Sequence, residues 1–183
     1  LLSGAERASK PFALNLMMAT MDETGQLPDC IRSGRVDGVI VVSTSELPIH
    51  PSMPVVRIFS PLLSTRHDLV LSDHEAIGHA AAQQLHEAGC ERCAFVNPHV
   101  GHQGFAVRRR AFVETLERLH VRTKAFEVDY QGDPAKLAAL VKSVLKGREA
   151  PDGIFLPGSD REVAAIAFEL QKQSARPLAG RKV

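Results

Sequence analysis

The sequence predicts an α/β protein in which parallel sheets are flanked by helices. Short apolar runs alternate with amphipathic stretches along all 183 residues, the order expected of repeated strand and helix units. The β-branched run that ends at Val42 is typical of a strand covered on both faces, and it stops abruptly at Ser43, Thr44 and Ser45. Because ligands gather beyond the carboxyl ends of parallel strands, this polar end marks a candidate binding edge.

The expected elements follow in chain order. Strands are predicted at 12–19, 36–42, 54–59, 69–71, 93–97, 125–130 and 153–156, with a further strand opening at 181–183. Helices between them are marked by a polar cap, a closing glycine, or both: one with Ser72 and Glu75 at capping-box spacing and Gly89 after it, one from Asp133-Pro134 to Gly147, and one from near Ser159, three residues before Glu162.

Composition limits the functional classes. The net charge of +1 argues against nucleic-acid binding by this segment itself, since that binding needs a basic face. No apolar run approaches a membrane span, and the N-terminus lacks both an initiator Met and a signal-peptide pattern, so the chain is expected to start inside a longer protein. Three cysteines, an odd number, fit a reducing cytoplasm better than a disulfide framework.

An arginine interrupts the apolar face of the helix predicted at 106–119. At 100° per residue Arg108 falls in the middle of this face, whereas Arg110 lies opposite, beside acidic residues, and Arg109 lies at the border. The residues that share the apolar face are Ala111, Phe112, Thr115, Leu116 and Leu119. A charge in this position needs a partner, which is either a structural salt bridge, water reached by snorkelling, or a ligand.

These residues resemble the LacI/GalR transcriptional regulators, and specifically their sugar-sensing domain with the type I periplasmic-binding-protein fold. The segments that carry the resemblance are VDGVIV at 36–41, MPVV at 53–56, LSD at 71–73, QLHEAGCERCAFV at 84–96, RRRAF at 108–112 and PDGIFLPGSD at 151–160. The resemblance implies two lobes, 1–72 and 73–183, with the fold incomplete at both ends. It also implies that a DNA-binding helix-turn-helix lies outside this chain.

The resemblance assigns candidate ligand-binding residues. Arg108 matches the arginine of the family's Arg-x-x-Gly-Phe motif, which binds polar groups of the effector. Tyr130, the only tyrosine, stands where relatives place an aromatic ring that stacks on the effector, although a tyrosine at a strand end can also simply pack. The further candidates are His102 in the loop before the Arg108 helix, Ser159 and Asp160 at the family's Asn-Asp, and Ser43 at the cleft rim. Capping of a helix explains Ser159 and Asp160 equally well.

Three departures from the family pattern lie at structural positions. The family's Gly-His turn is Gly89-Cys90 here, its Gly-Phe is Ala111-Phe112, and its Asp-Asn is Asp73-His74.

Other chemistries are less well supported. Cys90-x-x-Cys93 followed by His99-x-x-His102 has zinc-ligand residue types, but the strand between the two pairs is expected to separate them. No nucleophile motif, phosphate loop or paired carboxylate is evident, so we expect no enzyme activity, no metal and no cofactor.

The resulting hypothesis is an effector-binding and dimerisation domain of a cytoplasmic regulator. Its partners would be a small polar effector, with a sugar or sugar phosphate as the family default, a second copy in a homodimer, and operator DNA bound through the absent headpiece. The alternative is a free-standing periplasmic-type sugar-binding protein of a transporter, which shares the fold.

Overall fold

The computed structural model describes residues 2–21, 25–42, 47–58, 66–127, 133–146, 148–159, 162–164 and 167–168. Its elements confirm the predicted α/β class. In chain order they are α1 (Leu2–Ser9), the 3-10 helix η1 (Lys10–Phe12), α2 (Asp29–Arg32), β1 (Val39–Val41), β2 (Val55–Ile58), β3 (Asp68–Val70), α3 (His74–Glu87), β4 (Arg92–Asn97), α4 (Gln103–Arg118), β5 (Arg122–Glu127), α5 (Pro134–Val144) and β6 (Gly153–Phe155).

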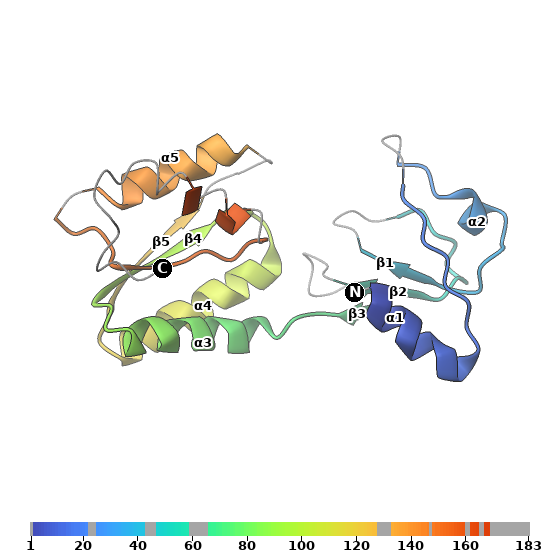
Figure 1. Ribbon diagram of the computed structural model, residues 1–183, viewed down its shortest axis with the longest axis horizontal. Coiled ribbons are helices and arrows are strands. Elements are labelled where there is room, and N and C mark those ends of the chain that lie inside the picture. The colour runs from blue at the N-terminus through green and yellow to red at the C-terminus, as the bar shows by residue number, and fades with distance from the viewer. Residues whose placement is uncertain are drawn as a thin grey trace.

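The strands form two parallel sheets of three strands each. The first sheet has the order β1-β2-β3 and the second has the order β5-β4-β6. The ribbon divides accordingly into two bodies, which an extended segment before α3 connects (Figure 1). In the second body, α3 and α4 cover one face of the sheet and α5 covers the other (Figure 1). β4 is therefore a central strand with helices on both sides.

Strand β4 is buried on both faces because its side chains alternate between two apolar clusters. Phe95 packs with Phe112 and Leu116 of α4 on one face, and its ring centroid lies 5.8 Å from that of Phe112. Val96, the next residue, packs on the other face with Leu137 and Val141 of α5. This two-sided burial explains the continuous apolar run at this strand in the sequence.

Helices α3 and α4 approach closely where small residues meet. A Cβ added at Gly78 of α3 would overlap the backbone carbonyl of Arg108 and the methyl group of Ala111, both on α4. Ala82, one turn further along α3, is completely buried. Because small residues meet at this crossing, the two helices pack closely against each other there.

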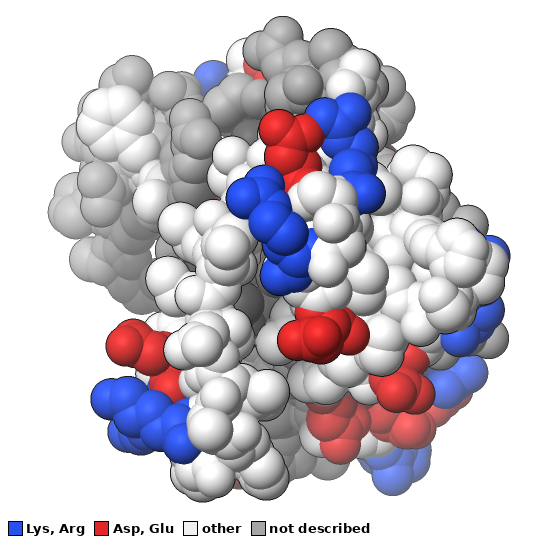
Figure 2. Space-filling model, turned by 90° about the vertical axis from the view of Figure 1, so that its right-hand side faces the viewer, with Lys and Arg blue, Asp and Glu red and all other residues white. Residues whose placement is uncertain are grey.

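The first sheet is covered less completely than the sequence predicted. Val41 and Val55 pack with Ile49 in a small apolar cluster. Ile40 and Val42, in contrast, are 53% and 59% exposed, so the expected burial of this strand on both faces is wrong for the described structure. The side of the molecule that carries this sheet presents mostly uncharged residues, with the charges in small groups (Figure 2).

The strand predicted at 12–19 is also wrong. Residues 10–12 form the 3-10 helix instead, Ala13 takes a left-handed φ of 52°, and residues 14–21 have no regular structure. The apolar side chains here are exposed, Phe12 by 74%. A strand exists only through ladder hydrogen bonds to a neighbour, and no described residue pairs with this segment.

Helix ends agree better with the sequence. Gly89 follows α3 with a φ of 78°, and Asp133 caps α5 by accepting a hydrogen bond from the backbone N–H of Ala135, as predicted. The cap of α3 is Asp73, which accepts from the N–H of Ala76, so the Ser72 capping box is wrong by one residue. Three predicted features lie outside the described residues: Gly147, the strand at 181–183, and residues 128–130 of the strand predicted at 125–130.

None of the described helices combines the length and apolar character that crossing a membrane would need.

Candidate functional site

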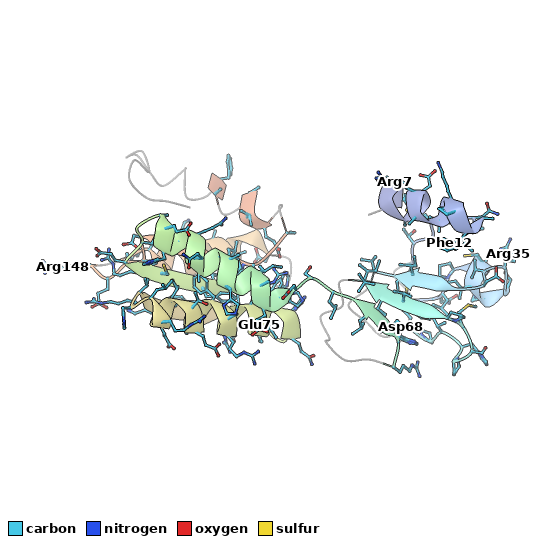
Figure 3. The ribbon with its side chains drawn as sticks, turned by 90° about the horizontal axis from the view of Figure 1, so that it is seen from below. Arg7, Phe12, Arg35, Asp68, Glu75 and Arg148 are labelled. Carbon is cyan, nitrogen blue, oxygen red and sulfur yellow. The ribbon has the colours of Figure 1, made fainter. Side chains whose placement is uncertain are left out.

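The candidate site lies at the carboxyl end of β4, where the first turns of α3 and α4 also lie. β4 ends at Asn97, α3 begins at His74, and α4 begins at Gln103. Glu75, in the first turn of α3, lies at the end of the second body that is nearest the first body (Figure 3). This edge is the position at which open parallel sheets bind ligands.

Five side chains gather at this edge, and we call them the Arg108 cluster. They come from the first residue of α3, the loop after β4 and the start of α4: His74, His99, His102, Phe105 and Arg108. The Arg108 guanidinium contacts the His74 imidazole and the Phe105 ring, and His99 and His102 pack against Phe105. Arg108 carries the only permanent charge among them.

Arg108 is half-buried and held on two sides. Its Nε donates a hydrogen bond to Nδ1 of His74 at 3.0 Å, and its guanidinium carbon lies 4.9 Å from the ring centroid of Phe105, a cation–π distance. Burial lowers the pKa of this guanidinium. Among the described residues no carboxylate lies within 4 Å of Arg108, so the structural salt bridge considered for it is not formed there.

The two neighbouring arginines are satisfied differently. Arg109 forms an ion pair with Glu127 of β5 at 2.7 Å, and Arg110 lies on the exposed face 3.9 Å from Glu114. The helical periodicity predicted this division between Arg108 and Arg110. Of the three, Arg108 is the one for which no ion pair with a described carboxylate is found.

His74 is buried, with 8% of its surface exposed. Because Nδ1 accepts the hydrogen bond from Arg108, the ring carries no proton on that nitrogen. Nε2 lies against Gly104, where an added Cβ would overlap the ring. Burial first, and then the charge of Arg108, lower the pKa of His74, while Asp73 raises it.

His102 caps α4. Its Nδ1 accepts a hydrogen bond from the backbone N–H of Phe105 at 3.3 Å, and its ring meets that of His74 edge-on at 6.0 Å. Burial lowers the pKa of His102, as do His74, Arg108 and His99. His102 lies before the Arg108 helix as predicted and caps it, and a ligand contact by His102 remains a prediction.

A buried carboxylate contacts the Arg108 cluster through His99 and also binds Ser159. Glu162 is 6% exposed, its Oε1 lies 2.7 Å from Nε2 of His99, and its Oε2 accepts hydrogen bonds from the backbone N–H and the hydroxyl of Ser159. Ser159 and Glu162 thus form the predicted capping box. A ligand contact by Ser159 remains a prediction.

The structure brings together only part of the predicted site. Arg108 and His102 lie in one cluster, and Ser159 reaches it through Glu162 and His99. Ser43, Tyr130 and Asp160 lie outside the described residues. Sequence reasoning missed His74, His99 and Phe105 as site residues. The change of the family's Asp-Asn to Asp73-His74 was a signal that could have identified His74.

The two cysteines of the Cys-x-x-Cys pair lie elsewhere. Cys90 and Cys93 form no disulfide with a described residue and are buried in the apolar cluster beside Phe95, at the amino end of β4, whereas His99 and His102 follow its carboxyl end. Burial raises the pKa of Cys93 to about 12. Within the described ranges no group of three His, Cys, Asp or Glu side chains could hold a metal ion.

No protein-family model matches the chain, and no curated protein is significantly similar to it. Solved structures do match. A LacI family transcriptional regulator from Bifidobacterium animalis subsp. lactis is 22% identical, with a TM-score of 0.70 over 96% of this chain and 68% of that one. The Cra transcriptional dual regulator from Pseudomonas putida, in complex with fructose 1-phosphate, is 19% identical, with a TM-score of 0.68 over 100% of this chain and 70% of that one.

Sugar-binding proteins share this fold. GanP, a glucose-galactose binding protein from Geobacillus stearothermophilus, is 20% identical, with a TM-score of 0.69 over 93% of this chain and 66% of that one. At these identities the comparisons establish the fold that the sequence resemblance implied, which is the periplasmic-binding-protein-like fold of LacI-family regulators. The chain spans about two thirds of the length of these three structures.

Proposed function

We propose that this chain is the sugar-sensing, dimerising part of a LacI/GalR-type transcriptional regulator. Two lobes, residues 1–72 and 73–183, would bind a small polar effector between them. One observation carries the proposal: Arg108 is half-buried at the carboxyl edge of a parallel sheet, and its charge has no carboxylate partner among the described residues. A ligand oxygen there would satisfy donors that the described protein leaves to solvent.

The chemistry of the cluster suits a sugar or sugar phosphate. With Nε bound to His74, the terminal nitrogens of Arg108 can donate a pair of hydrogen bonds to hydroxyl or phosphate oxygens. The first turns of α3 and α4 lie at the same edge, and their N–H dipoles add positive potential there. The partly exposed imidazoles of His99 and His102 supply flat ring surface for the C–H face of a sugar.

The response to ligand would be a change in lobe closure. In a homodimer, such a change alters how two DNA-binding headpieces, which lie outside this chain, meet the two halves of a palindromic operator. Effector and operator affinities are then coupled, and each changes the other by the same factor. The protein would carry out no chemical reaction, and its location would be the cytoplasm.

A second candidate is a periplasmic-type sugar-binding protein of a transporter, because the fold of GanP is equally similar. The unbridged cysteines favour the regulator, since a secreted protein meets oxidising conditions. The N-terminal sequence of the whole protein distinguishes the two. A helix-turn-helix supports the regulator, and a signal peptide supports the transporter component.

The proposed site is tested with Arg108→Ala in the whole protein, after a thermal-shift screen of sugars, sugar phosphates and nucleosides. Fructose 1-phosphate and glucose are the first probes. Calorimetry with the strongest binder should show a loss of at least about tenfold in affinity, since hydrogen bonds to a charged group contribute ~1.5–3 kcal/mol.

Arg110→Ala is the matched control, because it removes the same side chain from the exposed face of the same helix. It should leave the affinity unchanged. Undiminished binding by Arg108→Ala, with both variants folded, would show that the ligand lies elsewhere.

A further inference from the structure

The hydrogen bond between Arg108 and His74 uses the guanidinium nitrogen that a ligand needs least. A guanidinium group is planar and has five N–H donors in a fixed fork. Holding Nε at one point fixes the direction of the side chain and leaves the two terminal nitrogens together on the other edge. His74 Nδ1 holds Nε at 3.0 Å.

We propose that His74 is the positioning residue of Arg108, and that protonation of His74 releases the arginine and weakens ligand binding. This inference rests on the proposed ligand site. It adds to that site a residue that orients the binding group and a dependence of the affinity on acidity.

The His74 ring is locked from several sides, so it can act as a fixed support. The ring is buried, Gly104 lies against Nε2, and the ring of His102 meets it edge-on at 6.0 Å. Any side chain at 104 would occupy the space of the ring. The closest contacts therefore come from α4 and its cap, the same helix that carries Arg108.

Only the neutral ring can accept the hydrogen bond. A protonated imidazole donates from both nitrogens, so Nδ1 would then face Arg108 Nε with one N–H against another. The charged or titratable groups around His74 are Asp73 beside it in the chain, and Arg108 and His102 from α4 and its cap. Asp73 accepts the N–H of Ala76 as the cap of α3, and the other two groups oppose a positive charge on His74.

The direction of the pH effect follows. Burial and the charge of Arg108 lower the pKa of His74 below its ordinary value of 6.5. The ring is therefore neutral at pH 7.5, and it becomes mostly charged only at a pH below 6.5. Affinity should then be full near neutral pH and decline in acid. A residue that merely fills space would show no such pH dependence.

Two variants separate positioning from packing. In His74→Asn the amide Oδ1 is attached to Cγ, as Nδ1 is in histidine, so it offers an acceptor that does not titrate. In His74→Leu a methyl group occupies that position, which keeps bulk and removes the acceptor. His79→Leu is the matched control. His79 is also on α3, and its Nδ1 lies 2.6 Å from the hydroxyl of Thr115 on α4, away from Arg108.

The first test needs no ligand. The Nε–H signal of Arg108 is followed by NMR in the whole protein and assigned by its loss in Arg108→Lys. At pH 7.5 the wild type and His79→Leu should show slowed exchange of the Nε–H, expressed as a protection factor relative to an exposed arginine at the same pH, and this protection should be lost in acid. His74→Asn should keep it down to pH 5, and His74→Leu should lack it throughout. A protected signal in His74→Leu, or the same loss in acid for His74→Asn as for the wild type, would overturn the inference.

The second test measures affinity for glucose and fructose 1-phosphate in a pH series from 7.5 down to 4.5. Glucose has no titrating group, and the comparison with His74→Asn corrects for titration of the phosphate. The affinity of the wild type should fall progressively further below that of His74→Asn as the pH drops below 6.5, because the pKa of His74 is lowered from that value. Equal losses would overturn the proposed gating.

The two proposals fail in different ways. If Arg108→Ala binds as well as the wild type while the Nε–H results hold, the ligand site is wrong and the positioning is right. If Arg108→Ala loses binding but His74→Leu keeps both affinity and the Nε–H signal, the site is right and the role of His74 is wrong.

Discussion

The imidazole of His102 stacks on the ring of Phe105, with centroids 4.1 Å apart and planes 13° apart, while its Nδ1 accepts the N–H of the same residue. Stacking and capping both use the neutral ring. Because burial lowers the pKa of both His102 and His74, the unfolded chain takes up these two protons at higher pH than the folded chain does. The free energy of unfolding should therefore fall as the pH drops below about 6.5.

Urea denaturation at pH 7.5 and 5.5 measures this effect. Replacing both rings, with His74→Asn and His102→Asn, should reduce the difference between the two pH values, since asparagine caps a helix without titrating. An unchanged difference would mean that other groups dominate the acid response.

Gly104→Ala should destabilise the protein. In an open helical position this change stabilises by about 1 kcal/mol, because alanine is the better helix former. At 104 the new methyl group would overlap the His74 ring, and overpacking of this kind costs about 1–3 kcal/mol. Chemical denaturation measures the change in the free energy of unfolding. An increase would show that the His74 ring can move aside. The protected Nε–H of Arg108 should be lost in the same variant.

Cys93 should resist alkylation in the native protein. Its thiol is almost completely buried and has a pKa raised to about 12, so the reactive thiolate is scarce at neutral pH. Treatment with N-ethylmaleimide followed by mass spectrometry should find Cys93 unmodified until denaturant is added. Rapid native labelling at Cys93 would indicate that this part of the core opens frequently.

Asp152→Ala should weaken the junction between β4 and β6. One carboxylate oxygen, Oδ1, accepts the backbone N–H groups of both Glu91 and Arg92, and Oδ2 lies 3.3 Å from the Arg92 guanidinium. Removing the acceptor leaves the exposed N–H of Glu91 to water and the partly buried N–H of Arg92 without its carboxylate, at a cost of about 1 kcal/mol in the free energy of unfolding. Asp68→Ala, at an exposed strand position, is the control and should change it by less than about 0.5 kcal/mol. Equal effects would contradict the account.

What the sequence could predict depended on whether a residue's partner was near or far in the chain. Helical periodicity is local, and it correctly separated Arg108 from Arg110. The partner of Arg108 is His74, 34 positions away, which meets it only because Gly78 lets α3 and α4 cross closely. No local pattern contains that contact.

The same distinction explains the failed strand at 12–19. Its apolar run suggested a strand although it contains no β-branched residue, and a strand depends on a neighbour that sequence pattern does not identify. Six other predicted strands did find partners and were placed within a few residues. The cap of α3 moved by one residue because Ser72 and Asp73 are both good caps, and the chain direction after β3 decided between them.

The segment 71–73 joins the two bodies and ends directly at His74. Each residue of this joint has two rotatable backbone bonds, whereas His74 is already fixed in the first turn of α3. In the proposed lobe closure, bending at this joint would act one peptide bond away from the imidazole that holds Arg108. Lobe closure and the orientation of Arg108 would then be coupled through the peptide bond between residues 73 and 74.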